Sequence, residues 1–423
     1  MKRNSIIRKG TALLLSLLIC LGASGCQAKE EQAELDLSQT SFEDLVEQAK
    51  GSTVSFYGWG GDELINNWID TVFAPQMKEK YDITIDRVPM DIDQILNKLS
   101  SEVQAGKKDG SIDMIWINGE NFFSAKENNL LYGPFTQALP NFKNYVDETS
   151  SDTCYDFAYP IEGYEAPYGK AQLVLINDEE KTPETPSNAQ ELLEFVKKYP
   201  GQVTYPAPPD FTGSAFVRNI IYEFVDPEVF VDMEADKETV KAAIEPALAY
   251  LRELNPYLWK QGKSFPATVA QQETMYMDGE LLLHMRYESY WIATAIEKGI
   301  CSQTSRSFLF DNGTIGNTNF VAIAQNASNK AGALVAINGL LSPEIQASRY
   351  DQLKILPVLD NDKLSDEEKA LFDAVDPGPG TIPQEELLEK RLPEMPVKLV
   401  HGSLRHALRG GIFMLLNSKV LSN

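Results

Sequence analysis

Basic residues are scarce in this chain of 423 residues. Its 38 Lys and Arg stand against 61 Asp and Glu, so the formal net charge is −23. Nucleic-acid affinity comes largely from Lys and Arg on phosphate, which excludes nucleic acid as an expected partner. The acidic excess suits a soluble, charge-repelled surface protein, and it also fits a preference for a cationic ligand.

Cysteines are rarer still. Of the four, Cys20 and Cys26 lie near the N-terminus, which leaves Cys154 and Cys301 for the body of the chain. An exported protein can pair two such cysteines in a disulfide. Two separate small buried residues fit the sequence as well, so the pairing stays open.

Histidines are few, and the common catalytic motifs are absent from the sequence. The three histidines are His284, His401 and His406. His401 and His406 are five positions apart, whereas residues three or four apart share a helix face, and no cysteine or carboxylate accompanies them at ligand spacing. The sequence also lacks G-x-S-x-G, H-E-x-x-H and phosphate-loop runs. We therefore expect that the protein is not an enzyme and has no catalytic residue, no metal and no cofactor. His284 is expected to be buried in an apolar strand.

The apolar run from Thr11 to Leu21 is too short for a transmembrane helix, which needs about 20 such residues. It follows a basic stretch made of Lys2, Arg3, Arg8 and Lys9. This pattern predicts an export signal over residues 1–25. The segment ends in Ala23-Ser24-Gly25-Cys26, which is typical of a lipoprotein cleavage site, although Ala23 stands where Leu is usual. The alternative is an ordinary secretory signal with an incidental cysteine.

Residues 26–40 are polar and charged after Cys26, so they predict a flexible tether. Two or more acyl chains on Cys26 would give stable anchoring, at about 0.8 kcal/mol per buried CH₂. We expect a folded domain held by lipid on the extracytoplasmic face of the cell membrane.

The remainder, roughly 395 residues, is ample for two domains. Strands and helices alternate along it, which argues for parallel sheets covered by helices. The expected strands are 53–58, 83–88, 112–117, 171–177, 202–205, 279–285 and 319–323. The expected helices are 41–50, 65–73, 94–105, 214–224 and 331–341, and a proline-containing turn followed by a helix is expected within 182–198. We expect a first α/β lobe over 41–165, with later segments crossing back at roughly 285–345. A second α/β lobe is expected over 166–284, and helical segments of unassigned lobe over 346–423.

Three segments resemble a known family. Met275-Tyr276-Met277-Asp278-Gly279-Glu280, the run Phe320 to Lys330, and Leu340-Leu341-Ser342-Pro343-Glu344-Ile345-Gln346-Ala347 are similar to elements of extracellular solute-binding proteins of ABC transporters. The runs Phe56 to Gly61 and Trp116 to Phe122 resemble the YnjB-type branch of that family. From about Asp360 onward no motif matches.

This resemblance implies an α/β fold of the two-lobe periplasmic-binding-protein type, type II-like, with a ligand cleft between the lobes. It also implies that the chain delivers a small molecule to a membrane permease driven by an ATPase. No covalent step and no cofactor are implied.

Ligands of open α/β sheets sit beyond the carboxyl ends of strands, where helices begin. Three segments have that position, and each also suits a plain turn or helix cap. The candidate residues in them are Trp59, Gly60, Gly61, Asn118, Glu120, Asn121, Asp210, Thr212, Gly213 and Ser214. Glycines admit close backbone approach, and Trp59 offers a face to a ring or a cation. Free N–H groups at Thr212–Ser214 would suit an anion.

Candidates elsewhere are Tyr164, Tyr168, Tyr287, Glu288, Asn317 and Asn319. Glu288 with Tyr287 suits a cationic group, although a structural ion pair explains it too. A small organic cation, thiamine-like or polyamine-like, is the first hypothesis for the ligand, ahead of an anion or a carbohydrate. The rival functions are a non-transport surface sensor and a surface hydrolase with a carboxylate pair, one of raised pKa.

Overall fold

The computed structural model describes residues 35–400. Residues 1–39 and 40–423 form two separate units, and the account below concerns the second. The predicted signal peptide, Cys26, most of the predicted tether, His401 and His406 lie outside the described residues. Between Leu35 and Val400, no helix combines the length and apolar character needed to cross a membrane.

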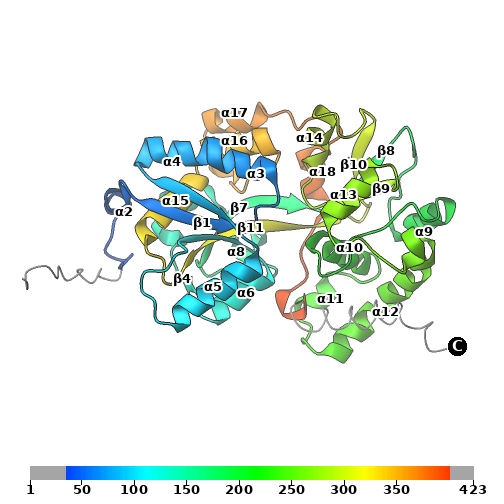
Figure 1. The fold of residues 1–423 in the computed structure, drawn as a ribbon, viewed down its shortest axis with the longest axis horizontal. Coiled ribbons are helices and arrows are strands. Elements are labelled where there is room, and N and C mark those ends of the chain that lie inside the picture. Colours follow the sequence, from blue (N-terminus) through cyan, green and yellow to red (C-terminus); the bar gives the residue numbers. More distant parts are fainter. Residues whose placement is uncertain (1–34, 401–423) are drawn as a thin grey trace, which may run out of the picture. The chain divides into compact units, whose positions relative to one another are not determined.

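A large mixed sheet organises the first lobe (Figure 1). Within the described residues it has seven strands: β1 (Thr53–Gly58), β2 (Thr84–Pro89), β3 (Met114–Ile117), β4 (Leu131–Tyr132), β7 (Glu165–Gln172), β11 (Thr314–Ala324) and β12 (Arg391–Leu392). β1 pairs in parallel with both β2 and β3, whereas β11 runs antiparallel to β3 and β7. The predicted alternation of strands and helices therefore produces a parallel core with an antiparallel edge.

Helices cover both faces of this sheet, with α3 and α4 on one side and α5 and α6 on the other (Figure 1). The helices of this lobe are α2 (Phe42–Ala49), α3 (Glu63–Trp68), α4 (Ala74–Tyr81), α5 (Ile92–Gln104), α6 (Glu120–Glu127), α7 (Pro140–Tyr145), α8 (Ser151–Cys154), α15 (Lys330–Leu340), α16 (Pro343–Leu353) and α17 (Asp366–Asp373). Local chemistry sets several starts: Ser41 and Asp44 form a capping box before α2, and Ser342 caps α16, which has Pro343 in its first turn.

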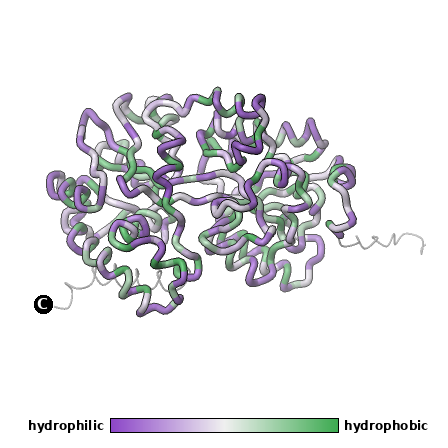
Figure 2. Tube along the Cα trace, turned by 180° about the vertical axis from the view of Figure 1, so that it is seen from behind, coloured by the Kyte–Doolittle hydropathy of each residue, from purple (hydrophilic) through white to green (hydrophobic). Residues whose placement is uncertain are grey.

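The second lobe is built around a small antiparallel sheet of order β10-β8-β9. Its elements are β8 (Val174–Asp178), β9 (Leu283–Arg286), β10 (Ser305–Phe308), α9 (Ala189–Lys198), α10 (Phe211–Tyr222), α11 (Glu228–Val231), α12 (Lys237–Leu254), α13 (Val269–Met277), α14 (Trp291–Glu297) and α18 (Gln384–Glu389). Apolar residues lie inside this packing and polar ones on the outer turns (Figure 2).

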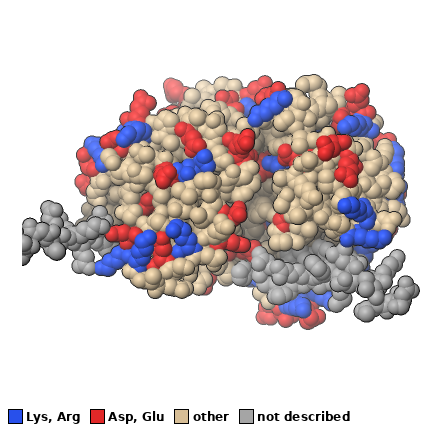
Figure 3. Space-filling view, viewed as in Figure 1, with Lys and Arg blue, Asp and Glu red and all other residues tan. Residues whose placement is uncertain are grey.

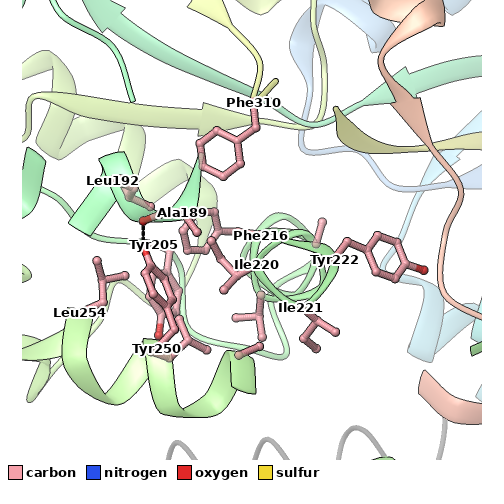
Figure 4. Close-up of a cluster of buried hydrophobic side chains, with 14 of the residues drawn as sticks. Ala189, Leu192, Tyr205, Phe216, Ile220, Ile221, Tyr222, Tyr250, Leu254 and Phe310 are labelled. Carbon is pink, nitrogen blue, oxygen red and sulfur yellow. Dashed lines mark hydrogen bonds between the residues drawn. The ribbon is translucent and has the colours of Figure 1, made fainter. Parts of the chain in front are cut away.

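Helix α10 lies at the centre of the second lobe, because its side chains are buried almost all round. Phe216 and Ile220 pack toward Tyr205, Leu254 and Phe310 (Figure 4). The Tyr250 hydroxyl satisfies its buried O–H by donating to the Ala189 carbonyl at 2.5 Å. An apolar helix enclosed in this way holds its N-terminus, and therefore Asp210, rigidly in place.

The chain passes between the lobes along β7 and β11, which pair side by side. β7 belongs to the large sheet, yet β8 begins two residues later in the small sheet. The prediction of one strand over 171–177 is therefore wrong. Gln172 still pairs with Gly316, whereas Val174 pairs with Arg286, and an uninterrupted apolar run does not reveal a change of partner.

One further secondary-structure prediction needs correction. Residues 202–205 form no strand, because their carbonyls accept from scattered donors: Leu282 N on Gln202, Trp259 N on Val203 and the Gln272 amide on Thr204. The proline-containing turn and helix expected within 182–198 are confirmed: Pro183 and Pro186 precede α9, which begins at Ala189 and is capped by Asn188.

Cys154 and Cys301 are both free, so the open question of their pairing is answered in the negative. His284 is fully buried in β9, as predicted. Burial lowers its pKa well below the ordinary histidine value, so it is neutral in the folded protein.

Candidate functional site

The loops that follow β1 and β3 lie at one edge of the large sheet, because these two strands are parallel. Trp59 follows β1 and is 44% exposed. Its ring lies 6.5 Å from Trp116 on β3, and Trp116 lies 6.0 Å from Tyr168 on β7. A Cβ on Gly61 would come within 2.2 Å of the Trp59 ring, so the glycine lets the indole fold over the loop.

This edge meets the second lobe at Asp62. The Tyr290 hydroxyl donates to Asp62 at 3.4 Å, while the other oxygen of Asp62 caps α3 by accepting from Leu64 and Ile65. Figure 3 shows the surface hollowed between the two halves at this boundary, with acidic groups beside the hollow. The ends of β1 and β9 therefore border a common groove.

Arg286, at the end of β9, carries an ion-pair cluster near Tyr290. Its guanidinium pairs with Glu273 at 2.8 Å and with Glu288 at 3.0 Å. Burial acts to lower the pKa of Arg286, but Glu288 and Glu273 raise it overall. Burial raises the pKa of Glu273. Glu288, predicted to meet a ligand, thus lies in a structural ion pair in this state.

The Asn118 loop is bound to the strand that joins the lobes. The Asn118 amide donates to Asn319 of β11 at 3.0 Å, and Gly119 N–H donates to Asp156. Gly119 has φ of 58°, and Glu120 opens α6. Asn121 N–H donates to the Asn118 carbonyl at 3.3 Å. Most of this predicted segment therefore shapes the loop itself.

The segment 210–214 opens α10 as predicted. The carboxylate of Asp210 accepts from Gly213 N–H at 2.9 Å and from Val269 N–H at 3.0 Å, and Ser214 N–H donates to the Asp210 carbonyl at 2.8 Å. The amides of Gly213 and Ser214 are thus used within the protein, which weakens the anion hypothesis. Phe211, not predicted, is 43% exposed and lies 5.0 Å from Tyr287.

Gly213→Ala is expected to destabilise the protein by about 1–3 kcal/mol, as overpacking does. Its Cβ would lie 2.0 Å from the Pro206 carbonyl oxygen, which is backbone and cannot swing away. Urea unfolding measures the loss, with Ser214→Ala on the same helix as the control. Equal midpoints for wild type and Gly213→Ala would contradict this close approach.

The remaining predicted tyrosines have structural partners. Tyr168 is fully buried beneath the Arg349 guanidinium, 3.6 Å from the ring centroid. The Tyr287 hydroxyl donates to Glu394 at 2.7 Å. Tyr164 packs beside Gly133 and Lys126, both in the first lobe. Sequence patterns pointed to none of Arg349, Arg218 and Glu394, since each is recognisable only from its partner.

A pocket of about 410 Å³ lies where the lobes join. We call it the hinge pocket, and its lining includes Asp152, Asp156, Phe157, Val231, Gly316, Asn317, Thr318, Arg391, Pro393 and Glu394. The first three come from the first lobe, and Asn317 and Thr318 come from β11. The segment after Pro393 enters the core of the second lobe through Met395. The volume of the hinge pocket is within the usual range for small-molecule sites.

The hinge pocket contains buried polar atoms that meet no hydrogen-bond partner in the described part of the chain. They are Oδ1 of Asp156, Oδ1 and Nδ2 of Asn317, and Oγ1 of Thr318. Leaving such a group unsatisfied costs roughly 1–3 kcal/mol. Asn317 was a predicted site residue, whereas Asp156 carried no signal in the sequence.

Asp156 also has a carboxylate neighbour, Glu165 on β7. Both are fully buried, and across residues 35–400 neither Glu165 oxygen has a hydrogen-bond partner. Burial is the main cause that raises the pKa of both groups well above the ordinary values. The charge of Glu394 adds to the effect on Asp156, and Asp156 adds to the effect on Glu165.

Two α/β lobes joined by paired strands, with a groove and a polar pocket between them, define a solute-binding protein of the periplasmic-binding type. Residues 73–372 match the family model for bacterial extracellular solute-binding proteins, and the chain belongs to this family. The predicted family and fold are thus confirmed. Members of this family are extracellular solute-binding proteins, so the chain is a solute-binding protein that acts outside the cytoplasm.

The chain is also similar to individual proteins of known sequence or structure. The chain is 39% identical to protein YnjB of Escherichia coli K12 over 314 residues, which are 74% of this chain and 80% of that protein. An ABC transporter structure from Clostridium perfringens covers 86% of this chain and all of its own length, with TM-score 0.60 and 20% identity. The spermidine/putrescine substrate-binding protein PotD from Streptococcus pneumoniae covers 86% of this chain and 99% of itself, with TM-score 0.61 and 14% identity.

Proposed function

We propose that this chain is the substrate-binding lipoprotein of an ABC importer. It is anchored through Cys26 on the extracytoplasmic face of the cell membrane, captures a small organic cation between its lobes, and delivers it to a permease and its ATPase. The lobes built on the large and small sheets move as two bodies about β7 and β11. Binding energy shifts the open–closed equilibrium, and no covalent step is needed.

Two observations support a cation as the ligand: exposed aromatic side chains, and a buried carboxylate oxygen without a partner in the described part of the chain. Trp59 and Phe211 are both partly exposed, and Phe211 lies 6.4 Å from Phe157 of the hinge pocket. Aromatic ring faces attract cations. Asp156 lines the hinge pocket, and its buried Oδ1 has no hydrogen-bond partner among residues 35–400. The spermidine/putrescine protein PotD shares the fold, which agrees with the proposal.

Arg349 is the group that would favour an anion. It is fully buried, and burial lowers its pKa, with Tyr168 and Tyr290 acting in the opposite direction. However, its guanidinium already donates to the Tyr168 carbonyl and lies over the Tyr168 ring. Its donors are therefore partly used by the protein itself.

Asp156 and Glu165 together have the raised pKa that a carboxylate hydrolase requires. A general acid must, however, come within hydrogen-bond reach of the substrate oxygen. Glu165 is fully buried, and the lining of the hinge pocket includes Asp156 alone of the two. The family is one of binding proteins, which also favours capture over turnover.

A thermal-shift screen tests the proposal on the chain from Lys29 onward. The panel contains thiamine, polyamines, amino acids, sugars, phosphonates and ferric chelates. A ligand at about 100 times Kd adds about 2.7 kcal/mol of stability. Shifts confined to cations support the proposal. Shifts in melting temperature confined to sugars or anions would support the importer function but reject a cation as the ligand. No shift with any compound in the panel would reject solute capture.

Trp59→Ala is expected to weaken binding of the best cation in that panel roughly 3- to 30-fold, because one cation–π face is lost. Since Trp59 is 44% exposed, the melting temperature of the free protein should change little. Isothermal titration measures the affinity. Tyr257→Ala, at 37% exposure on the second lobe, is the matched control. Equal losses in both variants would rule out a contact at Trp59.

A further inference from the structure

The hairpin formed by β5 (Tyr155–Asp156) and β6 (Tyr159–Pro160) has a strained backbone at its tip. The two tip residues, Phe157 and Ala158, have φ of 46° and 56°. A two-residue turn with positive φ at both positions usually contains Asn-Gly or Asp-Gly, because a Cβ disfavours this conformation. Such strain persists only where the surrounding structure holds it, and it is common at ligand clamps and switches. The contacts that hold the tip therefore indicate what the hairpin does.

Two contacts hold Phe157, a residue of the first lobe, on the second lobe. Its carbonyl accepts from Val397 N–H at 2.8 Å, in the segment that enters the core of the second lobe at Met395. The guanidinium of Arg218 on α10 lies 5.7 Å from the centroid of the Phe157 ring. The hairpin tip thus connects the lobes at a place separate from the paired strands β7 and β11.

The Phe157 ring also lies beside two of the loops predicted to bind the ligand. A Cβ on Gly119 would come within 3.2 Å of the ring, so the loop after β3 packs closely against it. Phe211, at the start of α10, has its ring centroid 6.4 Å from that of Phe157. Phe157 lines the hinge pocket and is only 6% exposed. A solute held by these two loops would therefore meet the Phe157 ring.

We propose that Phe157 is a gate: its ring occupies part of the site between the lobes, and a solute that binds there displaces it. This inference rests on the proposed function and concerns the regulation of the same site. Strain at Phe157 and Ala158 favours displacement, because both residues can leave the left-handed region when the tip moves. The contacts with Val397 and Arg218 oppose it. Their balance sets the fraction of molecules that accept a solute, and the apparent Kd equals the intrinsic Kd divided by that fraction.

Isothermal titration with spermidine and with thiamine tests the gate. Phe157→Ala removes the ring and should tighten binding roughly threefold or more, because the ring no longer competes with the solute. Phe157→Leu keeps most of the apolar volume, which protects the fold, and should tighten binding as well. Phe123→Ala is the matched control: Phe123 lines the same pocket but packs on Tyr159 of its own lobe, so its removal should not tighten binding.

Ala158→Gly tests the strain while keeping the ring. Glycine adopts positive φ freely, so this variant should stabilise the closed gate and weaken binding about 2- to 5-fold. Native-state hydrogen exchange measures the same gate without a solute, because it detects local opening. The Val397 amide should exchange faster than the Ile220 amide in the core of α10. Ala158→Gly should slow exchange at Val397 about 2- to 5-fold, and Phe157→Ala should accelerate it.

Two results would overturn the gate and leave the importer intact. One is binding of spermidine or thiamine by both Phe157 variants that is no tighter than in wild type. The other is exchange of Val397 at the rate of Ile220 in wild type and variants alike, since the tip would then open only when the whole lobe unfolds. No binding of spermidine or thiamine by any of these proteins would reject the proposed cation together with the gate.

Discussion

Glu394→Gln is expected to lower the free energy of unfolding by about 3–5 kcal/mol, the cost of leaving one partner of a buried ion pair without the other. Glu394 accepts from Arg218 twice at 2.9 Å and from the Tyr287 hydroxyl at 2.7 Å. Both charged side chains are about 96–97% buried. Although burial opposes it, Glu394 raises the pKa of Arg218, so the guanidinium stays charged after its partner is removed.

Urea unfolding measures this loss, and two further variants interpret it. The double substitution Arg218→Met with Glu394→Met should recover most of the stability, because an apolar pair of similar volume often replaces a buried ion pair without penalty. Glu245→Gln, in an exposed pair with Arg252, should cost less than about 1 kcal/mol. A Glu394→Gln midpoint equal to wild type would show that the pair does not hold the 391–399 segment on α10.

Glu165→Gln is expected to make the protein more stable than wild type at neutral pH and nearly equal near pH 4. The folded pKa of Glu165 is raised, chiefly by burial. Its contribution to stability is therefore fully present below the unfolded value of about 4.3 and is lost as pH rises toward the folded value. The difference in free energy of unfolding between variant and wild type should grow by about 1.4 kcal/mol per pH unit. This growth holds over the pH range in which Glu165 is protonated in the folded protein but ionised in the unfolded chain.

Unfolding at several pH values checks this, with exposed Glu238→Gln as the control. His284 affects wild type and variant alike: its lowered pKa makes stability fall as pH drops below about 6.5, so it cancels in the comparison. A constant gap between the two proteins from acid to neutral pH would show that Glu165 is ionised in the folded state.

Local sequence signals predicted much of the fold. The first strand occupies Thr53–Gly58 as expected, and α15 begins within one residue of its predicted start. These succeed because side-chain periodicity and capping are local properties. The prediction of one strand over 171–177 was wrong because an apolar run does not show a change of partner strand. Gln172 pairs with β11, whereas Val174 pairs with β9.

The candidate site was predicted only in part. Trp59, Asn118 and Asp210 could be singled out because each follows a strand or opens a helix. Their present hydrogen bonds could not, since Asn118 meets Asn319 and Asp210 meets Val269 from distant parts of the chain. Ligand contact by the predicted residues stays a prediction, to be tested by the variants above.

The sequence by itself determined the class of protein: alternating strands and helices, together with the motifs near Met275, Phe320 and Leu340, predicted a two-lobed solute-binding protein. Only the tertiary structure decided which charges are buried and which are paired. Asp156 and Glu165 become neighbours across a turn and a strand, and Arg218 meets Glu394 from 176 positions away. The sequence does not show whether water or protein surrounds a charged residue. Burial removes water from these groups, and this loss of hydration shifts their pKa values.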